Sequence, residues 1–291
     1  TPTPPRTGPD HMFAAQFRNE LVKLFSRKRT YIGFAAFIFT EFVILVLLSL
    51  PKVLAVFRKL VTQNGLEFNR YNSGLTLATF IIFFTVVILY TLYLALVSGD
   101  MVAKEVEDGT MRMILNRPVT RAHLIVQKIM ACVVHTCVLG LFIGITALLL
   151  ASLYQGGMGH LLVFDPREDV FAVFGPTEGL WRYSVAVGLM CLTFQPISAM
   201  ALMLSCFDIR PAAATVVTLT VFSIDMILRS IPLFEPIERY LIGHHVSCWV
   251  RSFRHTMSWA ETSESLLLLA GLTITCWVIG GAHFCTRDFK A

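Results

Sequence analysis

The sequence predicts an all-α integral membrane protein, and three observations support this fold class. Hydrophobic residues make up 55% of the 291 residues and charged residues only 15%, whereas a soluble domain usually carries about a quarter charged residues. Six apolar runs are long enough to cross a bilayer as helices, which takes about 20 residues each. A basic amphipathic segment precedes the first run. We therefore expect a single transmembrane domain over residues 12–291, with a lipid bilayer as its main solvent.

The six predicted spans are separated by polar segments that contain turn-forming residues. Glu41 lies inside the first span and Asp225 inside the fifth. Pro196 follows Gln195 in the fourth span and is expected to kink it, because proline removes a backbone donor and clashes with the preceding turn. The predicted spans are residues 31–50, 75–98, 129–154, 183–206, 212–228 and 265–284.

The segment before the first span is predicted to be an interfacial elbow helix over residues 12–30. Its apolar residues recur at helical spacing, and they are Phe13, Phe17, Leu21, Leu24 and Phe25. Its basic residues are Arg18, Lys23, Arg27, Lys28 and Arg29. A basic amphipathic helix of this kind lies in the membrane interface rather than across it; the alternative is an ordinary juxtamembrane helix. Residues 1–11 are rich in proline, do not have the charged-then-apolar order of a signal peptide, and are expected to be a disordered cytoplasmic tail.

Two longer segments between spans are not apolar enough to cross a membrane. Residues 53–74 contain an amphipathic helix pattern, and residues 231–264 are expected to hold short re-entrant or interfacial helices. With the amino end in the cytoplasm, six spans place both termini inside, with 14 Lys and Arg on that side and 10 outside. The excess of basic residues on the inside favours this orientation.

The cysteines and the net charge argue against a disulfide framework, a zinc site and a nucleic-acid partner. The seven cysteines form no CxxC pair, and most lie in apolar runs, where a thiol behaves as a small hydrophobe. Neither a disulfide framework nor a zinc site is indicated. The net charge of +5 is spread over the loops, so no nucleic-acid partner is expected.

The segment between the second and third spans has the pattern of short, rigid helices. Gly109 suits a left-handed helix cap, and Thr110 is a favourable N-cap for a short helix over residues 111–115. Residues 116–118, Asn-Arg-Pro, predict a turn, and Thr120 can cap the helix that becomes the third span. The expected result is a compact helix-turn-helix loop that projects from the membrane.

The run from Glu105 to Arg121 closely resembles the cytoplasmic loop of type-2 ABC exporter permeases, the transmembrane subunits of ATP-binding-cassette transporters. That loop has acidic residues, Gly-Thr, a Leu-rich turn, Pro-Val-Ser/Thr-Arg and a final Gly-Lys. The matching residues are Glu105, Glu107, Gly109, Thr110, Leu115, Pro118, Val119, Thr120 and Arg121. The chain departs at Gln127-Lys128, where Gly-Lys is usual. The whole chain is similar to the family's plan of an elbow, six spans and a final element, here Phe284 and Asp288.

The resemblance implies that the loop over residues 99–128 is a coupling helix element that docks a separate ATPase subunit. An apolar face with a charged rim suits a protein interface; the alternative is a solvated loop. The implied coupling residues are Glu105, Glu107, Gly109, Thr110, Met111, Leu115, Pro118 and Arg121.

The chain is not expected to hydrolyse ATP, because none of its 18 glycines begins a GxxxxGK[ST] phosphate loop. No cofactor is expected in this chain, while ATP and Mg are expected in the partner. The resemblance implies two copies of an ABC ATPase and a second permease chain, as a homodimer or heterodimer. It also implies a multi-pass protein of the plasma membrane, the inner membrane where a cell has two.

Glu41 and Asp225 are candidates for the substrate pathway, because carboxylates inside a membrane are costly and often functional. The resemblance implies that helices one and five line both the dimer interface and the route of the substrate. The structural alternative is an ion pair between Asp225 and Arg229, four residues apart on a helix, and a hydrogen bond from a neighbouring helix to Glu41.

Three further features have ordinary structural explanations. His135 on an apolar span is expected to be a packing residue, and the GxxxG pattern of Gly140 and Gly144 allows two helices to approach closely. A loose outer cluster matches no standard metal site, so no metal is expected there; it comprises His244, His245, Cys248 and His255.

The function predicted from these observations is a permease subunit of an ATP-driven exporter that forms half of the substrate pathway. The alternatives are an ion-driven secondary transporter, for which paired broken helices are expected, and an intramembrane lipid-modifying enzyme. The sequence contains no HExxH or GxSxG motif, which counts against the enzyme. An apolar pathway with few charges favours an amphipathic or lipidic cargo.

Overall fold

The computed structural model describes residues 9–115, 120–168 and 170–287, and it confirms the predicted fold class. Within these described ranges, six helices are long and apolar enough to cross a membrane. The first three spans are α2 (Lys28–Leu48), the continuous run α5 (Gly74–Thr85), η1 (Val86–Tyr90) and α6 (Thr91–Glu107), and α8 (Arg121–Gln155). The last three are the pair α9 (Pro176–Thr193) and α10 (Gln195–Cys206), α11 (Pro211–Ser230), and α14 (Trp259–Thr286).

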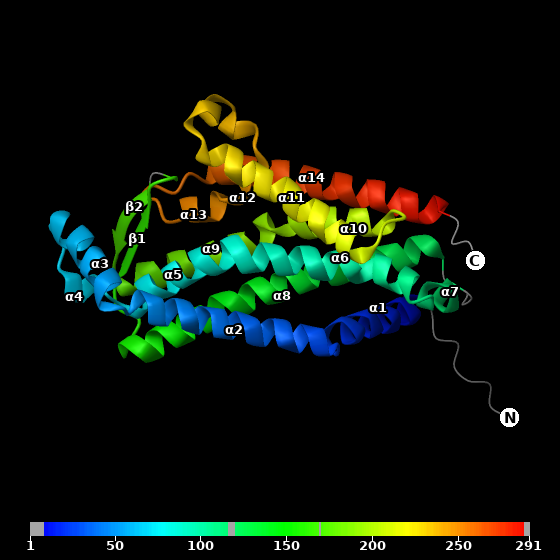
Figure 1. Ribbon diagram of the computed structural model, residues 1–291, viewed down its shortest axis with the longest axis horizontal. Coiled ribbons are helices and arrows are strands. Elements are labelled where there is room, and N and C mark those ends of the chain that lie inside the picture. The colour runs from blue at the N-terminus through cyan, green and yellow to red at the C-terminus, as the bar shows by residue number, and fades with distance from the viewer. Residues whose placement is uncertain (1–8, 116–119, 169, 288–291) are drawn as a thin grey trace.

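The shorter elements gather at the two ends of an elongated bundle (Figure 1). At one end, called here the α7 end, lie α1 (Pro9–Phe25), α7 (Thr110–Leu115) and the last turns of α14. At the other, the hairpin end, lie α3 (Pro51–Gln63), α4 (Phe68–Tyr71), β1 (Leu161–Asp165) and β2 (Val170–Phe174). The connection from α11 to α14 contains η2 (Pro232–Tyr240), α12 (Ile242–Val246) and α13 (Cys248–Arg251).

The elbow helix α1 begins at Pro9, so the last residues of the expected tail are helical. Residues 1–8 lie outside the described part of the chain. The second and third spans are longer than their apolar runs, because α6 continues to Glu107 and α8 starts at Arg121. Hydropathy alone misses these extensions, since their charged side chains are satisfied by other parts of the protein rather than by lipid.

Two spans are irregular, and their irregular parts meet. The interruption expected at Gln195-Pro196 divides the fourth span into α9 and α10 around Phe194. A π-helix, η1, interrupts the second span, which the sequence did not predict. The ring of Tyr90 in η1 lies 4.8 Å from the ring of Phe194, and its hydroxyl donates to the Thr136 carbonyl oxygen over 2.9 Å.

An antiparallel β-hairpin was also missed by the sequence analysis. Strands β1 and β2 pair from Leu161 opposite Phe174 to Asp165 opposite Val170. Both strands are rich in Val, Leu and Phe and are separated by a short polar turn, which is a recognised hairpin signal. The hairpin covers the ends of α5 and α9.

The GxxxG pattern is used where α8 packs against α9. A Cβ atom added to Gly144 would lie 2.6 Å from Cγ1 of Val187, and one added to Gly140 would lie 2.8 Å from Sγ of Cys191. Tyr183 fixes the same contact, because its hydroxyl donates to the Gly144 carbonyl oxygen over 2.7 Å. The absence of a side chain at these glycines therefore sets the spacing of the two helices.

We predict that Gly144→Ala lowers the thermal stability of the protein in detergent. The added methyl group meets a branched, stiff valine, and such overpacking typically costs about 1–3 kcal/mol. Gly188→Ala on α9 is the matched control, because nothing lies within 4 Å of its added Cβ. Equal midpoints of thermal unfolding for the two variants would contradict this account of the packing.

Candidate functional site

The described part of the loop between α6 and α8 has the predicted left-handed glycine, but α7 begins one residue earlier than predicted, so Thr110 is its first residue rather than its N-cap. Gly109 has a left-handed φ of 69°, and α7 begins at Thr110. The Thr110 hydroxyl donates to the carbonyl oxygen of Glu105 over 3.2 Å, which closes the corner between the two helices. The side chain of Leu115 and residues 116–119, with Pro118, lie outside the described part of the chain.

Two of the predicted coupling residues face the inside of the protein. Met111 is only 1% exposed and packs in the main hydrophobic core, and Glu105 is also buried. In this conformation, their side chains are therefore not accessible to a partner protein. Met113 is 66% exposed and Glu107 is exposed as well, so the outward face of the loop carries a methionine that the sequence analysis did not select.

Glu105 is the centre of a buried ion cluster that holds three helices together. Its Oε2 lies 2.7 Å from Nζ of Lys128 on α8, and its Oε1 pairs with Lys23 on α1. Lys128 also donates to the carbonyl oxygen of Met101 over 3.0 Å and lies 3.5 Å from Glu20. The elbow helix, α6 and α8 are thus fixed to one another directly beside the loop.

The flanking residues of the loop are also engaged within the protein. Arg121 donates to the carbonyl oxygens of Cys285, over 3.1 Å, and Arg287, over 2.7 Å, which ties the start of α8 to the end of α14. Gln127, where the related loops have glycine, donates to Gln16 of α1 over 2.8 Å. The departure from the family pattern therefore adds a contact with the elbow helix. Asp288 of the expected final element lies outside the described residues.

We predict that Lys128→Met strongly destabilises the protein, by about 3–5 kcal/mol, because it leaves the buried Glu105 carboxylate with fewer compensating charges. The double variant Lys128→Met, Glu105→Gln should recover part of this loss, since it removes the uncompensated charge. Thermal unfolding of the single and double variants measures the difference. A double variant less stable than Lys128→Met alone would contradict the buried pair.

The two intramembrane carboxylates have different surroundings. Glu41 on α2 is 0% exposed, and its Oε1 accepts a hydrogen bond from the Thr146 hydroxyl of α8 over 3.0 Å. It lines neither the apolar cavity beside η1 nor the polar pocket near α12, both of which are described below. Its contacts favour the structural alternative, a hydrogen bond between two neighbouring helices, over a place on the substrate route.

Asp225 on α11 is 7% exposed and accepts two backbone hydrogen bonds, from Ile242 over 2.8 Å and from Gly243 over 2.7 Å. The alternative pairing with Arg229 is not the contact that forms, because the Arg229 guanidinium bonds to Glu168 and Glu238. A Cβ atom at position 243 would collide with the Asp225 carboxylate. Asp225 therefore fixes the start of α12 to the side of α11.

Asp225 also lines a cavity of about 200 Å³ in the hairpin half of the bundle. The walls come mainly from η1, α10, α11, α12 and α13, and apolar side chains dominate them: Phe83, Val86, Val87, Phe194, Ile197, Phe222, Met226, Val246, Trp249 and Val250. Polar groups are supplied by the hairpin and by the last turns of α11, among them Glu168 and Arg229. The π-helix η1 forms part of one wall, and such helices occur often at functional sites.

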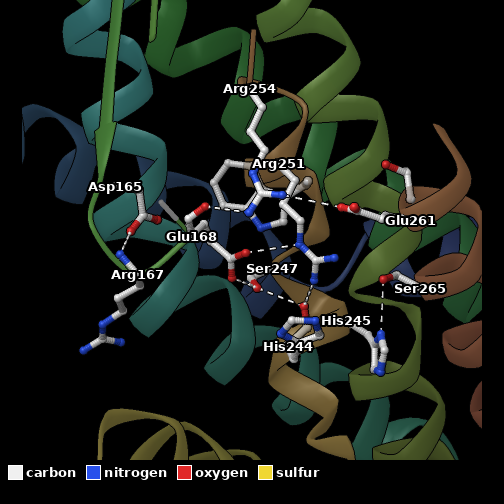
Figure 2. A network of polar contacts seen from close by, with 12 residues as sticks. Asp165, Arg167, Glu168, His244, His245, Ser247, Arg251, Arg254, Glu261 and Ser265 are labelled. Carbon is white, nitrogen blue, oxygen red and sulfur yellow. Dashed lines mark hydrogen bonds and ion pairs between the residues drawn. The ribbon is translucent and has the colours of Figure 1, made fainter. Parts of the chain in front are cut away.

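Glu168, in the turn between β1 and β2, is the centre of a second buried ion cluster (Figure 2). It is 6% exposed; its Oε1 lies 2.9 Å from the Arg229 guanidinium, and its Oε2 lies 3.1 Å from that of Arg251. The Ser247 hydroxyl donates a hydrogen bond to Oε1. The Arg254 guanidinium donates one to the backbone carbonyl oxygen of Glu168 over 2.8 Å.

The charges around Glu168 keep it ionised. Burial alone would raise the pKa of Glu168, but the Ser247 hydroxyl and the guanidinium groups of Arg251 and Arg229 outweigh this effect and hold it below the usual value. Burial and the charge of Arg251 lower the pKa of His244, so this histidine is neutral near pH 7.

A polar pocket of about 630 Å³ lies on the other side of the Glu168 cluster. It is lined by Glu168, Glu238, Arg239, Tyr240, His244, His245, Arg251, Arg254, Glu261, Glu264, Ser265 and Leu268. The outer histidines and cysteine do not converge: Cys248 is buried, and the ring of His255 lies 5.2 Å from that of Phe174. No group of three His, Cys, Asp or Glu side chains that could hold a metal ion occurs within the described residues.

Among the described residues, six helices of membrane-spanning length preceded by an elbow helix define a multi-pass membrane protein. A sequence-family model described as an ABC-2 family transporter protein matches residues 16–165, from the elbow to the first strand of the hairpin. The match covers slightly more than half of the chain, and the chain belongs to this family of ABC transporter permeases. Permeases of this family work in the membrane with an ABC ATPase. No curated protein and no solved structure matches the chain.

Proposed function

We propose that this permease is half of an ATP-driven exporter and docks a separate ATPase through the loop over residues 99–128. The α7 end faces the cytoplasm, and both termini lie on that side of the plasma membrane. The observation that carries the proposal is the exposed Met113 on a corner that the Glu105 cluster fixes to α1 and α8. A corner anchored in this way can transmit a displacement of the ATPase to the second and third spans.

The coupling residues then have two different roles. Met113, Glu107, Gly109 and Thr110 form the outward surface, in which an apolar centre with a polar rim suits a protein partner. The predicted residues that face inward or bond within the chain position this surface, and they are Glu105, Met111 and Arg121. ATP and Mg bind to two copies of the partner ATPase, and this chain supplies no nucleotide site.

We predict that Met113→Asp removes most of the ATPase from the purified permease without reducing the amount of folded permease. An unpaired charge at the centre of the interface costs more than truncation of an anchor, which is typically about 2 kcal/mol. Met158→Asp is the matched control, because Met158 is another exposed methionine but lies beside the hairpin. Co-purification of the ATPase with Met113→Asp at the level of Met158→Asp would contradict the docking surface.

The cavity beside η1 is the proposed membrane part of the substrate pathway. Its apolar walls and its polar groups near the hairpin suit an amphipathic cargo, and cavities of this kind are the usual binding sites of small molecules. Two spans, α11 beside the cavity and α2 elsewhere in the bundle, are only partly covered within this chain: about 28% of the apolar stretch of α11 is buried, and about 22% of that of α2. A second permease chain, identical or related, that packs against these two helices completes the pathway.

We predict that Val87→Trp lowers transport several-fold while the ATPase remains bound, because the larger ring fills part of the cavity that Val87 lines. Ile88→Trp is the control: it introduces the same ring at the next residue, which is exposed and does not line the cavity. Transport is measured in vesicles that contain the complex. The same loss of transport in both variants would place the pathway elsewhere.

A further inference from the structure

Glu168 separates two hollows of the hairpin half. It lines the apolar cavity of about 200 Å³ beside η1, and it also lines the polar pocket of about 630 Å³ formed with α12, α13 and the start of α14. In Figure 2 its carboxylate points at Arg251 and Ser247, with His244 and Arg254 around them. The side chain thus forms part of the wall between the proposed substrate cavity and the pocket on the far side from α7.

Three segments distant in the sequence meet at this carboxylate. Glu168 comes from the hairpin between the third and fourth spans, Arg229 from the last turn of α11, and Ser247 and Arg251 from the connection between α11 and α14. Arg254 adds a hydrogen bond to the backbone of the hairpin turn. Separation of the hairpin from α11 or from α13 therefore requires the Glu168 contacts to break.

The ion pairs of the Glu168 cluster can break at a low cost in free energy, as a closure that opens and shuts requires. A buried ion pair contributes little net stability, because the cost of removing both charges from water offsets their attraction. Once separated, the carboxylate and the guanidinium groups would each be hydrated, so the open arrangement is not heavily penalised. An apolar plug of the same size would instead expose hydrophobic surface to water each time it opened.

We infer that the Glu168 cluster is the outer closure of the substrate path, which keeps the membrane cavity apart from the outer pocket until the hairpin and α11 separate. The inference rests on the proposed function, because it takes the cavity beside η1 as part of the path. The charged and titratable groups around Glu168 are Arg229 and Glu238 on one side, and Arg251, Arg254 and the neutral His244 on the other.

A physical link connects this closure to the docking loop. α6, which ends at the loop, packs along α11, and the Thr215 hydroxyl of α11 donates to the Ala95 carbonyl oxygen of α6 over 3.5 Å. Gly99 gives close approach at the same place, because its added Cβ would lie 3.0 Å from Oγ1 of Thr215. A displacement of α6 by the ATPase therefore moves α11 and with it Arg229.

The test measures how fast a cysteine in the cavity reacts with a thiol reagent added from outside. Val86→Cys places a thiol in the cavity wall, and a small, permanently cationic methanethiosulfonate reaches it through water but not through lipid. The parent without Val86→Cys gives the background from the seven native cysteines. In membranes, Glu168→Gln is expected to raise the rate of Val86→Cys modification at least tenfold.

Glu264→Gln is the matched control, because Glu264 lines the same outer pocket but does not contact the Glu168 carboxylate. Its modification rate is expected to equal that of the parent. An unchanged rate in Glu168→Gln, or an equal increase in Glu264→Gln, overturns the inference. Should Glu168→Gln fail to fold, Ser247→Ala removes one hydrogen bond from the same carboxylate, and a rate no higher than the parent's then overturns it.

A second arm separates failure of the closure from failure of the proposed function. With the closure contacts intact, ATP added to the permease–ATPase complex should raise the rate of Val86→Cys modification, as α11 moves. If Glu168→Gln opens the cavity but ATP has no effect, the closure stands and the proposed coupling is wrong. If ATP-dependent transport is present and Glu168→Gln changes nothing, the proposed function stands and the closure is wrong.

Discussion

The buried pair of Glu105 and Lys128 is the interaction on which the α7 end depends. Neither charge is solvated, so each must be satisfied by the other and by Lys23, Glu20 and the Met101 carbonyl oxygen. These partners belong to α1, α6 and α8, and the pair therefore fixes the relative position of three helices at one point. α6 ends two residues after Glu105, so the corner at Gly109 is held in place by this cluster.

At the hairpin end, a buried carboxylate surrounded by basic groups again holds separate segments together. Glu168 is held by Arg229, Arg251 and Ser247, and its contacts join loops rather than long helices. Between the two ends the packing is of another kind, because lipid offers no hydrogen-bond partners and each helix satisfies its own backbone. There, small residues such as Gly144 decide how closely helices approach. Ion clusters thus define the two ends, and apolar packing defines the middle.

Much of the fold could be predicted from the sequence. Six apolar runs predicted the number of spans, since a helix must have a certain length to cross a bilayer, and Gly109 adopts the left-handed conformation predicted for it. The hairpin and η1 were missed for different reasons. The hairpin strands are short and lie between two much longer apolar runs, which dominate the sequence pattern. The π-helix leaves no mark in an apolar run, because an extra residue in one turn does not change the hydropathy.

The candidate site was predicted only in part, and the reason is physical. Residue type and spacing predicted a short helical loop, showed that no GxxxxGK[ST] motif is present, and placed carboxylates inside two spans. They could not determine which side of α7 faces the protein, so Met111 was taken as a contact although it is buried and Met113 is exposed. Nor could they show that Arg229 bonds to Glu168, 61 residues away, rather than to Asp225 one turn before it. Composition and local pattern specify helices; only the packing of those helices decides which charges meet and which surfaces remain free.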